Sequence, residues 1–232
     1  MKASKGRSEL DGMIVEIELT LVSIIQGVAL TVLIESSRDA ITELKFSQWP
    51  YVLAGLLVIF IFWSRAVLHI ITLIRWPLEF GHNFLYIGCA LIEAVTFAQL
   101  SRPANWFGFG VAFIAAGWVL FFYDLRLIQT RQRDSAGEAG NRLYARVQRD
   151  QWMNLALLLP GVFVLNLACA VCIRIWPAIF LGHDTHLWLI GIQLVGFAGY
   201  LIYVVRFYVD LAPLIADAHR EWHGTTGDRD QS

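Results

Sequence analysis

The stretch that decides the fold is residues 49–100, which reads WPYVLAGLLVIFIFWSRAVLHIITLIRWPLEFGHNFLYIGCALIEAVTFAQL. It holds two apolar runs separated by Arg75-Trp76-Pro77, where the proline ends the first run. A helix advances about 1.5 Å per residue, so about 20 mainly apolar residues are needed to cross the hydrocarbon of a bilayer. Both runs are long enough, and we interpret them as two membrane-spanning helices joined by a tight turn.

The composition of the whole chain supports the same interpretation. Of its 232 residues, 57% are hydrophobic and 16% are charged, whereas a soluble domain carries roughly 25% charged residues. The missing charges leave long apolar runs at residues 13–34, 49–74, 82–100, 105–128, 151–175 and 187–209. These runs predict an all-α, polytopic membrane helix bundle of about six transmembrane helices, surrounded by the lipid bilayer.

The predicted organisation is one transmembrane domain, residues 13–212, between a polar N-terminal segment, residues 1–12, and a polar C-terminal tail, residues 213–232. An arginine-rich loop, residues 129–150, joins the fourth and fifth spans and holds five arginines. With an even number of spans, both termini lie on the same side as this loop. Because Lys and Arg accumulate on the cytoplasmic side, we expect cytoplasmic termini and a place in the cell membrane (the bacterial inner membrane or its equivalent).

Several function classes find no support in the sequence. The net charge of -1 argues against a nucleic-acid partner, which would need a basic face. The chain has no H-E-x-x-H, no glycine-rich phosphate loop and no nucleophile elbow, so it is not predicted to be an enzyme. The cysteine pair Cys169 and Cys172 lies in an apolar run and is interpreted as packing residues. No catalytic residue, cofactor or metal site is predicted.

The first span carries a stripe of small and polar residues. At 100° per residue, one face of the helix holds Glu16, Thr20, Ser23, Gly27 and Thr31. Such a stripe suits close packing of two helices, with the hydroxyls bonded to backbone carbonyls. It equally suits the lining of a pore formed when several subunits turn this face to a shared axis. Both interpretations remain open at the level of sequence.

Three ionisable residues lie deep in the second and third spans: Arg65, His69 and Glu93. Such groups are costly in hydrocarbon and face a protein interior or a water path. Counted from the starts of their antiparallel spans, Arg65 and Glu93 reach similar depths, which predicts an ion pair between them. The pair would either hold the hairpin together or act as a gate, with His69 as a nearby titrating group.

A haem-binding electron carrier is a further alternative. Two histidines, His69 and His82, would have to lie at matching depth on facing helices. Counted along their own spans, His69 is near the end of the second and His82 at the start of the third. The match in depth is therefore loose.

The order of motifs resembles the transmembrane-protein-175 type of potassium channel. That family has Phe-Ser-Asp-Gly in its first helix, and residues 23–33, SIIQGVALTVL, keep the glycine and the aliphatic run with its threonine but not Phe-Ser-Asp. The family's second helix has a Trp followed by a His, as Trp63 and His69 are here at wider spacing. Its third helix opens with an Asn, like Asn83 before Phe84-Leu85.

The resemblance implies a tetramer of six-helix subunits whose first helix lines the pore. Together with the stripe, it predicts a homo-oligomeric, potassium-like cation channel or transporter-like pore. The alternative from a different class is a structural or signalling protein without transport activity. In that alternative, residues 129–150 would dock a cytoplasmic protein partner.

Overall fold

The structure, a computed structural model, describes residues 2–73, 80–134 and 137–228. Every regular element in these ranges is a helix, which confirms the all-α class. The elements are α1 (Lys2–Thr42), η1 (Phe46–Gln48), α2 (Trp49–Leu73), α3 (Phe80–Phe97), α4 (Pro103–Asp134), α5 (Glu138–Met153), η2 (Asn154–Leu158), α6 (Leu159–Ile175), α7 (Pro177–Phe180) and α8 (His186–Asp228). The predicted turn at 75–77 lies outside the described residues.

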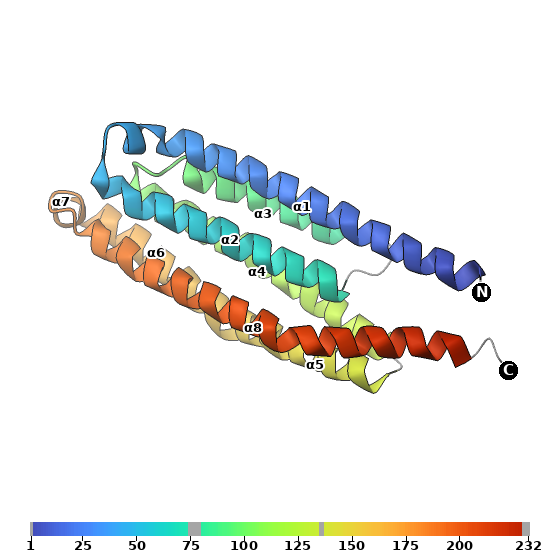
Figure 1. The fold of residues 1–232 in the computed structure, drawn as a ribbon. Helices are drawn as coiled ribbons and strands as arrows, with labels where there is room; N and C mark the ends of the chain where they lie inside the picture. The colour runs from blue at the N-terminus through green and yellow to red at the C-terminus, as the bar shows by residue number, and fades with distance from the viewer. Residues whose placement is uncertain (1, 74–79, 135–136, 229–232) are drawn as a thin grey trace.

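Among the described residues, six helical segments are long and apolar enough to cross a membrane. They are Met13–Thr42, Phe46–Thr72, Phe80–Phe97, Pro103–Arg133, Glu138–Ile175 and His186–Ala218. The long helices lie side by side along one direction, and the start of α1 and the end of α8 are at the same end of the bundle (Figure 1). The predicted number of helices able to cross a membrane is confirmed, while their insertion in a membrane and the cytoplasmic location of that end stay predictions.

The bundle is held together around α4, which packs extensively against α3 and α6 and also contacts α5. Helix α2 packs against α1 on one side and α8 on the other. Large buried side chains fill the contacts, including Tyr51 and Phe107 in one cluster, Tyr86 in a second, and Tyr144 and Leu211 in a third. The elements that meet in these clusters come from all parts of the chain.

Most of the arginine-rich loop predicted at residues 129–150 is helical: of its described residues, 129–134 and 138–150 belong to helices and Gly137 is in a bend. The prediction of a loop was therefore wrong for these helical residues. Helix α4 continues to Asp134 and α5 begins at Glu138. In α5, Leu143, Tyr144 and Val147 are buried, and the helix packs against α8. Apolar residues at this spacing form one face of a helix, so the arginines between them occupy the solvent-facing side of an amphipathic helix.

Helices α5 and α6 form one continuous span with a π-helical turn, η2, between them. Pro160 follows this turn at the start of α6. A proline has no N–H to donate to the carbonyl of the preceding turn, and a wider π turn lets the helix continue past it. The turn also contains Asn154, which is fully buried and belongs to the polar network described below.

The N-terminus of α5 is capped by a side chain from α8. The Glu221 carboxylate accepts hydrogen bonds from the backbone N–H groups of Glu138 (3.0 Å), Ala139 (2.9 Å) and Gly140 (3.4 Å). A carboxylate at this position satisfies donors that have no partner within the helix and complements the helix dipole.

We therefore expect Glu221→Gln to loosen the contact between α5 and α8 by about 1 kcal/mol. Amide hydrogen exchange at residues 138–140 should rise about fivefold, as measured by mass spectrometry. Asp217→Asn, which removes a carboxylate one turn earlier on α8 that pairs with Arg220, is the control and should leave these amides unchanged. Equal exchange in both variants would contradict the cap.

Candidate functional site

A buried ion pair joins α2 to α5. Arg65 Nη1 lies 2.7 Å from Asp150 Oδ2, with the two side chains only 7% and 1% exposed. The other terminal nitrogen of Arg65 donates to Gln151 Oε1 at 3.1 Å. Removing either partner would leave a charge in a low-dielectric interior, which is far more costly than burying both.

This pairing corrects the predicted ion pair between Arg65 and Glu93. Glu93 instead accepts a hydrogen bond from Gln26 of α1 at 3.3 Å. The prediction failed because it placed Asp150 in a loop outside the membrane. The helical path of α5 brings that carboxylate into the bundle, where it meets the guanidinium first.

The Asp150 carboxylate organises a network over four helical elements. It accepts hydrogen bonds from Tyr203 of α8 at 2.6 Å and from the amide of Asn154 at 3.2 Å. Tyr200, also on α8, donates to Asn154 Oδ1 at 2.7 Å. Together with Arg65, these partners satisfy both carboxylate oxygens, so α2, α5, η2 and α8 are tied to one another at a single depth.

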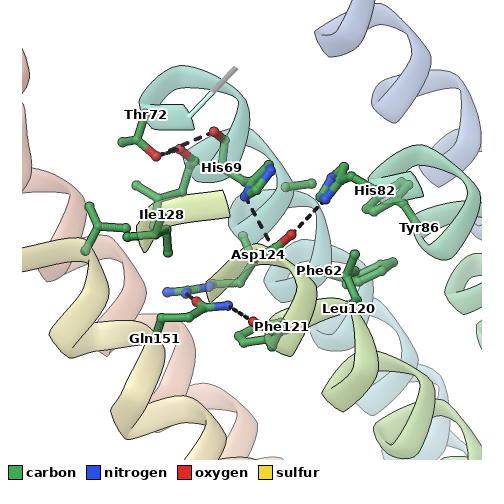
Figure 2. A pocket seen from close by; sticks show the side chains of 14 residues that line it. Phe62, His69, Thr72, His82, Tyr86, Leu120, Phe121, Asp124, Ile128 and Gln151 are labelled. Carbon is green, nitrogen blue, oxygen red and sulfur yellow. Dashed lines mark hydrogen bonds and ion pairs between the residues drawn. The ribbon is translucent and has the colours of Figure 1, made fainter. Parts of the chain in front are cut away.

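A second polar cluster contains His69 of α2, His82 of α3 and Asp124 of α4. His82 Nδ1 lies 2.9 Å from Asp124 Oδ1, and His69 Nδ1 lies 3.5 Å from Asp124 Oδ2. The imidazole rings stack with centroids 4.1 Å apart and planes inclined by 5°. Figure 2 shows both rings directed at the same carboxylate, and all three residues are buried.

The places of the two histidines within α2 and α3 explain why they meet. His69 is near the end of α2 and His82 near the start of α3, so both are close to the same end of the bundle. The loose match in depth came from counting each residue along its own span. The haem alternative finds no support, because axial ligands point their nitrogen edges at an iron between them whereas these rings meet face to face.

Beyond the ion pair lies a cavity of about 220 Å³ with a mainly apolar lining. Arg65, Glu93 and Tyr200 line it, as do Asn166 and Gln193. Gln193 and Tyr200 are two turns apart on α8, or about 10 Å along the helix. Polar groups therefore lie at separate depths along the cavity, which runs among α2, α3, α4, α6 and α8.

Further polar contacts continue to the end of the bundle away from the termini. Gln193 donates to Asn166 Oδ1 at 3.0 Å and accepts from the Trp106 indole at 3.2 Å. At that end, the Tyr51 hydroxyl and His186 Nδ1 are 2.9 Å apart. Both line an open recess of about 500 Å³. Buried polar groups are thus present at several levels from one end of the bundle to the other.

The stripe predicted on the first helix lies on the outer surface of α1. All five members are exposed: Glu16, Thr20, Ser23, Gly27 and Thr31. The hydroxyls of Thr20 and Thr31 donate to backbone carbonyls of their own helix at 2.8 and 2.9 Å. No residue of α1 lines the central cavity. Within one subunit the stripe therefore packs against no other helix, and both interpretations of it remain open.

The sequence analysis missed two acids that the structure places at the site, Asp124 and Asp150. Asp124 lies inside the fourth apolar run, residues 105–128, and an acid within a span is by default a functional candidate. Asp150 offered a weaker signal, because it stands at the boundary of a polar segment. The charged and titratable partners of both acids lie far away in the sequence: Arg65 for Asp150, and His69 and His82 for Asp124.

The sequence matches no protein-family model, no curated protein and no solved structure. The resemblance to the potassium channel family therefore remains a prediction. The geometry of the buried polar groups is the basis on which a function can be proposed.

The ion pair makes a prediction about stability. Asp150→Asn should destabilise the protein by about 3–5 kcal/mol, because it leaves the Arg65 charge buried without a counter-charge. The double variant Arg65→Met/Asp150→Leu should recover much of this loss. The measurement is denaturant unfolding in detergent, followed by circular dichroism.

Glu93→Gln serves as the control for the rejected pair. Its effect should add to that of Arg65→Met within about 0.5 kcal/mol, as expected for residues that share no partner. A strong coupling between Arg65 and Glu93, with none between Arg65 and Asp150, would contradict the observed pairing.

Proposed function

We propose that this protein is a transporter-like membrane protein that moves cations through the interior of its helix bundle. The observation that carries the proposal is the succession of buried polar groups around the central cavity. It begins with the cluster of His69, His82 and Asp124, and continues past the Arg65–Asp150 pair. It ends at the contact between Tyr51 and His186.

The free-energy cost of placing ionisable side chains inside a membrane supports the proposal. A bundle held together by apolar packing alone needs none of them, and ionisable residues inside spans mark ion paths and proton relays in other membrane proteins. Three acids, Asp124, Asp150 and Glu93, are buried and favour a positive charge. Histidine and carboxylate side chains exchange protons readily, so a proton is the cation that this interior suits best.

A second candidate rests on the exposed stripe of α1. In a homo-oligomer, several copies of this face could surround a shared axis, with Glu16 as a cation-attracting ring at its mouth. This candidate agrees with the resemblance to potassium channels and makes potassium the expected ion. The third candidate, a protein partner docked on the arginine-bearing face of α5, requires no transport at all.

Ion flux into proteoliposomes distinguishes these candidates. Proton, potassium and sodium gradients would be tested separately with the purified protein. Gly117 lines the cavity, and a Cβ added there meets nothing within 4 Å. Gly117→Phe should therefore place its ring in the cavity and reduce flux about tenfold or more.

The matched control is Gly199→Phe, at an exposed glycine of α8 whose added Cβ also meets nothing within 4 Å. It should transport normally. Flux that survives Gly117→Phe but is lost in Ser23→Trp would move the path to the stripe of α1. No flux under any gradient, from wild-type protein shown to be folded, would reject both paths and favour the docking role.

A further inference from the structure

We propose that His69, His82 and Asp124 form a binding site for a divalent transition metal ion of the Zn²⁺ class. The three side chains come from three different helices, α2, α3 and α4. Their potential ligand atoms all lie within 4.8 Å of one another. Two imidazoles and one carboxylate are the donor set found in zinc sites that keep a fourth position for water or substrate.

The distances within the cluster suit such a site. Zinc binds nitrogen and oxygen ligands at about 2.0–2.2 Å, so neighbouring ligand atoms in a tetrahedron are about 3.4 Å apart. His82 Nδ1 lies 2.9 Å from Asp124 Oδ1, and His69 Nδ1 lies 3.5 Å from Asp124 Oδ2. Both rings face the same carboxylate (Figure 2), so small rotations of the carboxylate and the rings would bring one oxygen and two nitrogens to the spacing of a tetrahedral site.

There is also room for an ion. A cavity of about 30 Å³ is lined by all three residues together with Thr72 and Gln151, and about 10–15 Å³ is enough to hold one water. His69 Nε2 is buried and has no hydrogen-bond partner among the described residues. A buried nitrogen without a partner is costly, and a water held in the cavity would relieve that cost while Nδ1, the nitrogen that faces Asp124, binds the ion.

The charges around the cluster permit a divalent cation. Arg65 lies close enough to act electrostatically on both Asp124 and His69, and its positive charge alone would oppose metal binding. Asp150, at 2.7 Å from the guanidinium, offsets that charge. Asp124 then remains as the negative charge that faces the site. Imidazole and carboxylate ligands together favour zinc, cobalt or nickel over potassium or sodium.

A metal here would fasten α2, α3 and α4 to one another. This inference does not depend on transport, because binding can be measured on purified protein in detergent. Failure of the flux experiment would therefore leave it standing, and its own failure would leave the proposed cation path standing.

The probe is Co²⁺, whose visible absorption reports both binding and geometry. Wild-type protein without an affinity tag should bind about one Co²⁺ per subunit with an intense tetrahedral spectrum, and Zn²⁺ should abolish the signal. His69→Ala and Asp124→Asn should each weaken Co²⁺ binding about 100-fold or more. His186→Gln is the matched control, because it removes a buried histidine at the opposite end of the bundle and should bind as wild type does.

His82→Cys keeps a metal ligand at the same position. It tests whether residue 82 binds the ion, because a bound thiolate would add a new absorption band. A thiolate bound to Co²⁺ adds a charge-transfer band in the near ultraviolet, which wild type should lack. Absence of Co²⁺ and Zn²⁺ binding by folded wild-type protein would overturn the proposal. So would binding that is unchanged in both His69→Ala and Asp124→Asn, or a thiolate band already present in wild type.

Discussion

The cost of placing a charge inside a membrane is the constraint on which the structure depends. Arg65 is buried in the bundle, so its helix is favoured to pack where a carboxylate is available. Asp150 supplies it at 2.7 Å, and the carboxylate in turn holds Tyr203 and Asn154. One ion pair therefore sets how α2, α5 and α8 approach one another. Apolar packing allows many rotations of these helices, whereas a buried ion pair whose carboxylate accepts two further hydrogen bonds allows few.

The same constraint connects the two polar clusters. Arg65 has Asp150 as its direct partner and Asp124 within electrostatic range, so it lies between the ion pair and the histidine cluster. A change in either carboxylate would alter the balance of charge at the other. This coupling gives the interior a way to respond to an arriving cation, whether that cation is a proton on the proposed path or a metal at the proposed site. The outward-facing stripe on α1 is separate from this coupling between the two clusters. None of the described side chains of α1, residues 13–42, lines the central cavity.

Much of the fold could be predicted from local patterns. The apolar runs identified all six spans, because hydropathy is a property of neighbouring residues along the chain. Arg65, His69 and Glu93 stood out because each is an ionisable group in an apolar run. The loop predicted at residues 129–150 failed because high polarity was taken for irregular structure, although Leu143, Tyr144 and Val147 carried the spacing of an amphipathic helix. The missed helix was also the reason that Asp150 was assigned to the wrong environment.

By itself, then, the sequence determined that the protein is a bundle with six helices long and apolar enough to span a membrane and that ionisable residues lie within them, because both features are encoded by short-range composition. Only the tertiary structure decided which charge meets which. Arg65 and Asp150 are separated by 85 positions of chain (150 − 65), and His69, His82 and Asp124 lie on three helices. Whether such residues touch depends on the depth and rotation of each helix. The depth and rotation of each helix depend on how all the helices pack together. A local sequence pattern therefore cannot predict them.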